Sequence, residues 1–204
     1  MSRLPAAKRK EQLLDCAMQL FAAHGYARAT TAELAKLAGV TEPIIYRHFD
    51  SKLDLFVALI ERTAGMTLTT WERQLAGVND PSERLRRLIG ENPMVSEQGR
   101  TAYRVFLQAI TEADNPKIKD ALTKHIQSVH TFLLREIERA QENHKVTARF
   151  SAELLAWLLI HLGMGYGVLS AMTIPSHGTD KTGAHVQDVI ARLLVGRTGD
   201  KPDA

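Results

Sequence analysis

The sequence predicts an all-α protein in which a small three-helix domain containing a helix-turn-helix precedes a larger helical bundle. Three observations predict this fold. Apolar residues recur at helical period in almost every segment, and we find no alternating strand pattern and no internal repeat. Residues 30–55 contain two short helical segments joined by a glycine turn, followed by a third helix. A length of 204 residues suffices for one small and one medium domain.

The composition is that of a soluble globular protein, with 45% hydrophobic and 24% charged residues. The single cysteine, Cys16, lies among apolar helical residues, which predicts a reduced core thiol and excludes an intrachain disulfide framework or a Cys-based zinc site. The basic N-terminal residues are not followed by an apolar segment, so we expect no secretory signal. A net charge of +3 and an isoelectric point of about 9.1 are compatible with DNA binding.

The first predicted helix has an apolar stripe and ends at Gly25. The next helix begins at Thr30, because Thr30 and Glu33 have the spacing of a capping box. We expect Leu34 and Leu37 to lie on the buried face of this helix.

A tight turn follows at Gly39, which can adopt the positive φ that such a turn requires. Thr41 is the expected cap of a second short helix, and Pro43 lies in its first turn, where a missing N–H costs nothing. Ile45 and Phe49 are expected to point inward. This pattern predicts a helix-turn-helix, whose second helix enters the major groove of DNA.

The rest of the chain predicts further helices separated by capping and turn signals. In chain order, we expect a helix from Ser51 that runs into residues 66–75, a helix from Asp80, a loop at 92–99, a helix at 103–110 that stops near Asp114, a long helix from Asn115, a helix from about 147 to 172, and a last helix at 185–194.

The stretch AGVTEPIIYRHFDSKLDL, residues 38–55, resembles the signature of the TetR family of bacterial transcription regulators. The shared features are a turn of small residues, a capped recognition helix, a Tyr-x-His-Phe ending, and Ser-Lys at the start of the next helix. The resemblance is sharp over residues 12–59. It implies a DNA-binding domain at residues 1–50, a linking helix from about 51, and a ligand-binding and dimerisation domain over 51–204.

Side chains suited to DNA contact cluster around the predicted recognition helix. A helix N-terminus at Thr31 attracts phosphate through its free N–H groups. By resemblance, the phosphate-contacting positions are Tyr46, His48 and Lys52, and the surface that faces base edges comprises Thr41, Glu42, Pro43, Ile44 and Arg47. Taken singly, each could be a packing or a solvated residue. Taken together in one turn-centred array, they favour DNA contact.

Two of these residues suggest specific base chemistry. Ile44 stands where the family often has a small polar residue, and it could contact a thymine methyl group. Glu42 would be repelled by phosphates, but it could accept a hydrogen bond from a cytosine amino group.

An effector cavity is implied by the resemblance, and its lining is predicted from aromatic and apolar residues of the C-terminal helices. The candidates are Tyr103, Phe106, Leu107, Phe132, Trp157, His161 and Met164, with Tyr103 and His161 as polar anchors. Each could equally be a core residue. The mostly aliphatic lining suits an elongated apolar or acyl-type molecule better than a flat aromatic cation.

Residues 154–174 lack any formal charge, and their length alone would allow a membrane-spanning helix. His161 and three glycines within the run favour a buried or interfacial helix of a soluble protein instead. The resemblance implies that the last two helices pair with their mates in a homodimer. Gly163 and Gly167 would then permit close approach across the two-fold axis.

The sequence therefore predicts a cytoplasmic, homodimeric transcription regulator, more often a repressor than an activator, which leaves its double-stranded DNA operator when a small, mostly apolar effector binds. Motifs of phosphate-loop, zinc-protease and serine-hydrolase chemistry are missing, so we expect neither enzymatic activity nor a cofactor or metal. Two alternatives stay open. One is a membrane-attached sensor anchored by residues 154–174, and the other is a helical ligand-binding protein or enzyme with a vestigial helix-turn-helix.

Overall fold

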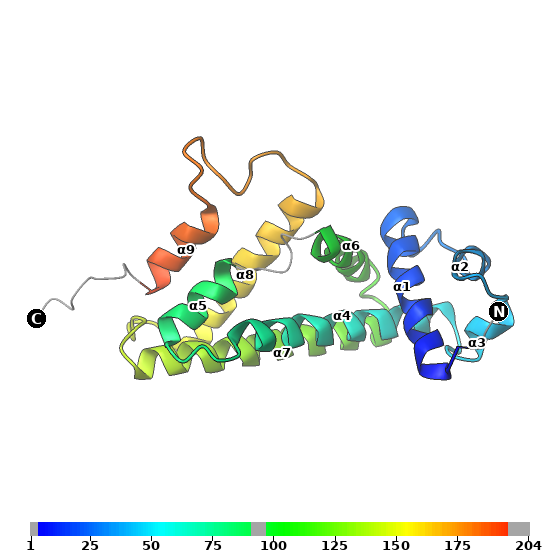
Figure 1. Cartoon of the computed structure of the whole chain (residues 1–204), viewed down its shortest axis with the longest axis horizontal. Coiled ribbons are helices and arrows are strands. Elements are labelled where there is room, and N and C mark those ends of the chain that lie inside the picture. Colours follow the sequence, from blue (N-terminus) through cyan, green and yellow to red (C-terminus); the bar gives the residue numbers. More distant parts are fainter. Residues whose placement is uncertain (1–3, 91–96, 196–204) are drawn as a thin grey trace, which may run out of the picture. The chain divides into compact units, whose positions relative to one another are not determined.

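The computed structural model describes residues 4–90 and 97–195, without the side chains of residues 97 and 98. Within these residues the regular elements are helices, which confirms the all-α prediction (Figure 1). They are α1 (Ala6–His24), α2 (Thr31–Ala38), α3 (Glu42–Tyr46), α4 (Lys52–Leu75), α5 (Pro81–Gly90), α6 (Glu97–Thr111), α7 (Pro116–Glu142), α8 (Ala152–Ala171) and α9 (Val186–Val195).

The helices form two compact units, each with its own hydrophobic core. The first unit joins residues 4–65 to residues 97–125, and the second joins residues 66–90 to residues 126–195. The division therefore falls inside α4 and inside α7. The predicted boundary between a DNA-binding domain at residues 1–50 and a ligand-binding and dimerisation domain over 51–204 stays a prediction.

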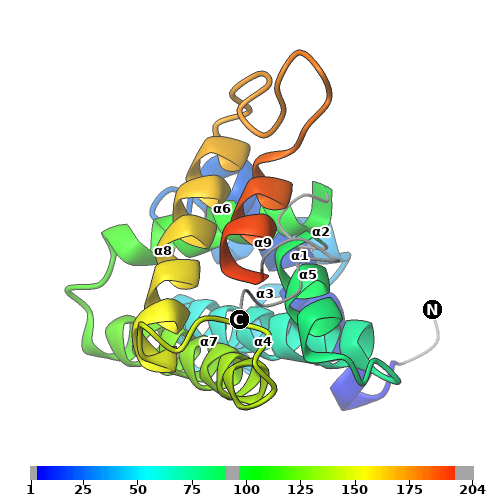
Figure 2. The same cartoon turned by 90° about the vertical axis from the view of Figure 1, so that its left-hand side faces the viewer.

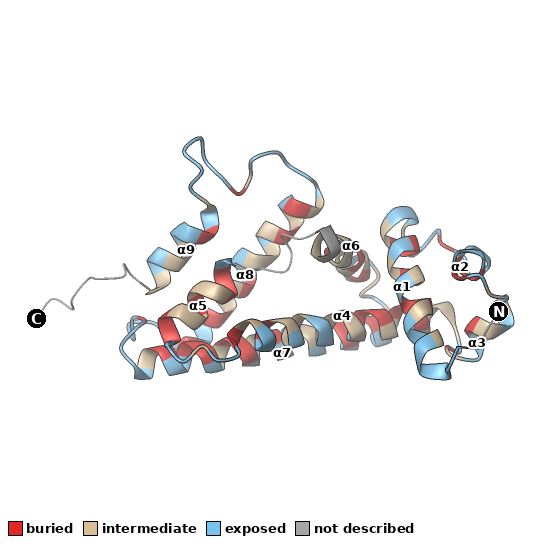
Figure 3. Cartoon of the chain, viewed as in Figure 1, coloured by how far each residue is buried: buried red, intermediate tan, exposed pale blue. Residues whose placement is uncertain are grey.

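The first unit is built around the buried faces of α1, α2 and α4, to which α6 and the start of α7 add side chains (Figure 3). An aromatic trio lies at its centre. The rings of Tyr26 and Phe56 are stacked with centroids 4.0 Å apart, and Phe21 meets both rings edge-on. Val105 of α6 and Ile118 of α7 are buried in the same core. This unit therefore contains the predicted helix-turn-helix together with helices that lie far along the chain.

The second unit buries side chains of the last turns of α4, of α5, of most of α7 and of α8. α9 packs against α5 (Figure 2). Gln187 is the buried residue of α9, whereas Val186, Val189 and Leu193 are exposed apolar residues of that helix. Leu193 is 82% exposed. α9 is therefore held by one side only within this chain.

A buried ion pair connects α5 to α7 in the second unit. Arg84 Nε donates to Glu136 Oε2 over 2.6 Å, and its Nη2 donates to Oε1 over 2.9 Å. Its Nη1 donates to the carbonyl oxygens of Leu75 and Val78 over 3.1 and 2.9 Å. Burial raises the pKa of Glu136, but the hydrogen bonds and charge of Arg84 outweigh burial and hold that pKa below its ordinary value. The guanidinium thus holds α7 and the end of α4 in place at once.

α8 has an exposed apolar face, although it also contributes buried residues to the core. The exposed side chains recur at helical spacing, and they are Leu154, Leu158, Leu162, Leu169 and Met172. The glycine on this face is Gly165, where an added Cβ would meet only open space, whereas Gly167 is buried. Close approach of a partner helix at Gly163 and Gly167 stays a prediction, and within this chain Gly167 is already covered. Sequence alone fixed the spacing of the glycines but not the side of the helix that the core covers.

By length and composition, α8 could cross a membrane, and 28% of its apolar window is buried within the chain. Core helices of soluble proteins pass the same test, so this one helix is weak evidence for a membrane.

Other boundaries shift by a few residues from those predicted. α8 begins at Ala152, capped by the Ser151 side chain, which accepts from the N–H of Leu154. The predicted start near Thr147 is therefore too early. Residues 97–99 belong to α6, whereas the rest of the loop expected at 92–99 lies outside the described residues. Asp80 and Asn115 cap α5 and α7 through their side-chain oxygens, as predicted.

Breaking the Arg84 pair should strongly destabilise the second unit. Arg84→Ala leaves the buried Glu136 carboxylate, which is 3% exposed, with its longer ion pair to the exposed Arg135, whose Nη2 lies 3.5 Å away, so we expect a loss of about 3 kcal/mol in the free energy of unfolding. Urea denaturation measures this loss. In the wild type, the lowered pKa of Glu136 contributes to the free energy of unfolding. This contribution is fully present above the ordinary pKa of glutamate, and it is lost as the pH falls through the lowered pKa.

Arg87→Ala is the matched control, because its ion pair with Glu83 is 38% and 45% exposed. We expect it to cost less than about 1 kcal/mol. An equal loss of unfolding free energy in the two variants would contradict the role described for the buried ion pair of Arg84.

Candidate nucleic-acid interface

The first helix of the helix-turn-helix, α2, begins with the predicted capping box. Thr30 Oγ1 accepts from the N–H of Glu33 over 3.2 Å, and Glu33 Oε2 accepts from the N–H of Thr30 over 2.8 Å. These hydrogen bonds, above all that from the Thr30 backbone, lower the pKa of Glu33. Leu34 is buried as expected, but Leu37 is 48% exposed, so its predicted burial is wrong. The apolar face of α2 is narrower than the periodicity suggested.

The turn and the second helix follow the sequence signals closely. Gly39 has φ +65°, and the N–H of Val40 donates to the carbonyl of Ala35 over 2.9 Å. Thr41 occupies the N-cap position of α3 with extended backbone, but its side chain makes no capping hydrogen bond there. Pro43 lies in the first turn, and Ile45 is buried at 1% exposure. The cap expected from the Thr41 hydroxyl is therefore absent, which leaves that hydroxyl exposed beside the recognition helix.

The predicted DNA-contacting residues gather around α3. Exposed or half-buried side chains along this helix and at its ends are Thr41, Glu42, Pro43, Ile44, Tyr46, Arg47 and His48. Thr31, at the start of α2, joins them through its hydroxyl, which lies 3.2 Å from both Glu42 Oε2 and Tyr46 OH. Lys10 of α1 lies over the ring of Phe49, with its Nζ 5.6 Å from the centroid. The result is one polar surface formed by α3 and the start of α2.

Lys52 is placed differently from the other predicted residues. Its Nζ donates to the carbonyl oxygens of Tyr26, Ala27 and Ala29 over 3.0, 3.4 and 3.0 Å. It also lies 4.6 Å from the centroid of the Tyr26 ring. The ammonium group thus holds the turn that leads from α1 into α2, and its contact with a phosphate stays a prediction.

A residue that sequence reasoning missed holds the same turn from the other side. Gln108 of α6 accepts from the N–H of Tyr26 over 2.8 Å, and its amide donates to the carbonyl of Phe21 over 2.8 Å. A helical pattern does not reveal which distant backbone groups a glutamine meets, so nothing in the sequence could single it out. Gln108 makes α6 part of the support for the helix-turn-helix.

The predicted effector residues are divided between the two units. Tyr103, Phe106 and Leu107 lie on α6 in the first unit, where burial raises the pKa of Tyr103. The second unit holds the other four, which are Phe132, Trp157, His161 and Met164. There, the Trp157 ring lies 4.4 Å from that of His130 and 6.4 Å from that of His161. Whether these residues contact a ligand stays a prediction.

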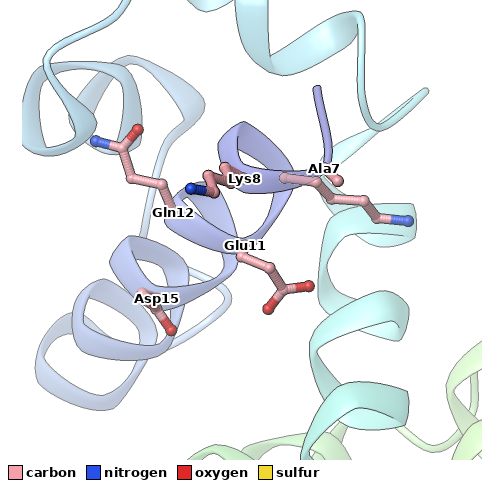
Figure 4. Close-up of a pocket in the computed structure, with 6 residues that line it drawn as sticks. Ala7, Lys8, Glu11, Gln12 and Asp15 are labelled. Atoms are coloured by element: carbon pink, nitrogen blue, oxygen red, sulfur yellow. The ribbon is translucent and has the colours of Figure 1, made fainter. Parts of the chain in front are cut away.

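A surface hollow on α1 is a different feature. It is lined by residues of that helix alone, which are Ala7, Lys8, Lys10, Glu11, Gln12 and Asp15 (Figure 4). Nearby, Arg62 of α4 pairs with Glu11 and Asp15 over 3.2 and 2.7 Å. The charged lining of this hollow does not resemble the apolar effector cavity expected from the sequence. The hollow contains none of the seven predicted effector residues.

Comparison with known proteins supports the interpretation of α2 and α3 as a helix-turn-helix. The family model described as "Bacterial regulatory proteins, tetR family" matches residues 13–59, which include α2 and α3. The nucleoid occlusion factor SlmA of Vibrio campbellii is 32% identical over 135 residues, which are 66% of this chain and 68% of that protein. The HTH-type transcriptional activator FasR of Mycolicibacterium smegmatis is 34% identical over 130 residues, which are 55% of this chain. That match spans 59% of the length of FasR.

The similarity of fold extends to the C-terminal helices. A transcriptional regulator from Saccharomonospora viridis, solved in complex with choline, matches with a TM-score of 0.75 and 25% sequence identity. The match covers 92% of this chain and 94% of that one. The helix-turn-helix and the helices that follow it therefore recur together in a regulator of known structure.

Lys52→Ala should reveal both roles of its ammonium group. Three backbone carbonyls lose a donor, so we expect a lower melting temperature, and one positive charge near the DNA surface is lost. Affinity for all DNA sequences should fall, and the slope of log affinity against log salt should flatten by about one unit. Lys119→Ala, an exposed lysine of α7 in the same unit, is the control for charge alone. A lower melting temperature with an unchanged salt slope would leave Lys52 a structural residue only.

Proposed function

Because the chain belongs to the TetR family of bacterial transcription regulators, we propose that it is a homodimeric repressor that a small, mostly apolar effector releases from its operator. The observation that carries the DNA-binding part is the helix-turn-helix itself, in which α3 presents exposed side chains while Ile45 and Phe49 anchor it to the core. The family is one of transcription regulators, and no enzymatic family is indicated.

The proposed contacts follow the chemistry of the surface. Phosphates would be bound by Thr31, Tyr46, His48 and Lys52, which offer two hydroxyl groups, an imidazole and an ammonium. Base edges would be read by Thr41, Glu42, Pro43, Ile44 and Arg47, of which Arg47 is exposed and suited to guanine. Two copies of α3 in a dimer would enter successive major grooves about 34–36 Å apart or somewhat farther.

Dimerisation is proposed through the exposed apolar faces of α8 and α9. Leucines recur along one side of α8, and Val186, Val189 and Leu193 lie along one side of α9. Exposed apolar faces of this extent on two helices mark an association surface. Gly165 lies on the α8 face with open space in front of it, so a partner helix could approach closely there. The same face accounts for the apolar character of α8 without a membrane, which supports a cytoplasmic location.

The effector is proposed to be an elongated apolar or acyl-type molecule bound among the helices of the C-terminal domain. The related regulator with bound choline supports a small-molecule site in this fold. Binding would release the operator only to the extent that the effector prefers the conformation that does not bind DNA.

A map of chromosomal binding sites tests the function as a whole. We expect a few sites upstream of genes, the gene for this protein among them, with higher transcription of those genes when the protein is deleted. Lower transcription on deletion would instead indicate an activator, as the name of FasR describes.

The SlmA relatives support a second candidate, nucleoid occlusion, which predicts many sites across the chromosome and little change in transcription. Recovery in the membrane fraction after cell lysis would favour the membrane-attached sensor.

Leu158→Glu should convert the proposed dimer into monomers. The charge would be placed in the centre of the α8 face and would lose its hydration on association. Met66→Glu is the matched control, because Met66 is 46% exposed on α4 and Leu158 is 47% exposed. Sedimentation should show a monomer for the first variant and a dimer for the second, with weaker operator binding by the monomer. An intact dimer in both would place the two-fold contact elsewhere.

Trp157→Ala should change the effector response more than it changes folding. Trp157 is half-buried, whereas Trp71, the only other tryptophan in the sequence, is 9% exposed in the second core. Truncation of Trp71 should cost about 3–5 kcal/mol in the free energy of unfolding, and truncation of Trp157 clearly less.

The Trp71→Phe variant leaves Trp157 as the sole tryptophan, so its fluorescence emission should shift to the blue as a series of fatty acyl compounds is added. A large loss of melting temperature and of DNA binding in Trp157→Ala would make it a packing residue.

A further inference from the structure

A chain of hydrogen bonds joins the start of α2 to both ends of α3. Thr31 Oγ1 donates to Glu42 Oε2 over 3.2 Å and lies 3.2 Å from Tyr46 OH. The Thr31 hydroxyl has one hydrogen, and an ionised carboxylate only accepts, so the donation runs from Tyr46 to Thr31 to Glu42. Because Glu42 is the first residue of α3 and Tyr46 the last, the carboxylate is held in one place relative to both helices.

The chain uses the two hydroxyl hydrogens that phosphate oxygens would accept. If Thr31 and Tyr46 are to donate to phosphates, the Thr31 hydroxyl has to turn away from Glu42. The half-buried carboxylate then loses its donor at a surface where bound DNA displaces part of the water that could replace it. A charged acceptor without a donor in such a place costs free energy. Nonspecific DNA binding therefore carries a penalty that originates at Glu42.

One feature of the major groove can remove this penalty. Among the base edges there, only cytosine and adenine present an amino group, through N4 and N6. Adenine places its N7 acceptor beside that amino group, which repels a carboxylate, whereas guanine N7 and O6 and thymine O4 only accept. Cytosine is therefore the base whose major-groove edge suits the Glu42 carboxylate.

We propose that Glu42 determines sequence specificity by exchanging its internal donor, the Thr31 hydroxyl, for the amino group of one cytosine in each operator half-site. This inference rests on the proposed placement of α3 in the major groove. At the cognate base pair the exchange is complete, and Thr31 and Tyr46 are free to bind phosphate. At any other base pair, either the carboxylate stays without a donor or the two hydroxyl groups stay turned toward it.

The test is selection from a randomised duplex DNA library with the full-length protein. Wild type should enrich a half-site with one invariant cytosine that depends on residue 42. Glu42→Gln should move the preference at that position to adenine, because an amide both donates to N7 and accepts from N6. Glu42→Ala should lose the preference at that position only. In both variants the ratio of operator affinity to nonspecific affinity should fall about tenfold or more, mainly because nonspecific binding tightens.

Asp50→Asn is the matched control, because it removes the same charge from an exposed residue just after α3. It should leave every base preference unchanged. If Asp50→Asn and Glu42→Gln lower the ratio of operator affinity to nonspecific affinity equally, general charge repulsion explains the effect and the proposal is overturned. Unchanged preferences in both residue 42 variants, with wild type still selecting a defined operator, would overturn it while leaving the proposed function intact. If wild type enriches no sequence, the proposed function fails, and this inference fails with it.

Discussion

The helix-turn-helix depends on the turn between α1 and α2, whose backbone carbonyls point to one place. Carbonyl groups of Tyr26, Ala27 and Ala29 need donors, because paired backbone groups are the rule inside folded proteins. The Lys52 ammonium supplies all three hydrogen bonds from the first turn of α4. Gln108, on α6, accepts from the N–H of Tyr26 and donates to the carbonyl of Phe21. The turn that leads into α2 is therefore held by residues that follow it in the sequence.

This arrangement explains why α6 belongs to the first compact unit although it follows the linking helix by many residues. Val105 and Ala109 of α6 are buried in the same core as α1, and Gln108 lies between them and the turn. Lys117 at the start of α7 is joined to Asp54 of α4 over 2.7 Å, and Asp54 also bonds the Ser51 cap. Any displacement of α6 thus acts on the support of α2 inside a single packed unit. For a regulator, this is a place where a conformational equilibrium can alter DNA binding by changing few contacts.

Local signals predicted the elements well, and tertiary packing decided what they missed. The capping box at Thr30, the left-handed Gly39 and the buried Ile45 depend on neighbours within a few residues, so the sequence alone contained them. Leu37 was misplaced because helical period defines a stripe, whereas the width that the core covers depends on other helices. The partners of Lys52 lie 23 to 26 residues away, and those of Gln108 lie 82 and 87 residues away. No pattern of spacing contains such pairs.

Three donors of the proposed DNA surface, Lys52, Tyr46 and Thr31, are engaged within the protein before DNA arrives. Lys52 gives its ammonium hydrogens to carbonyl groups, and Tyr46 and Thr31 donate along a chain that ends at Glu42. Binding DNA then exchanges existing hydrogen bonds for new ones, and such exchanges contribute little net free energy. In the proposed complex, much of the affinity would come from the release of counterions around the phosphates, which does not depend on sequence. In the proposed complex, specificity would come from the base contacts of α3 and from whether the Glu42 carboxylate finds a new donor when the Thr31 hydroxyl turns to a phosphate.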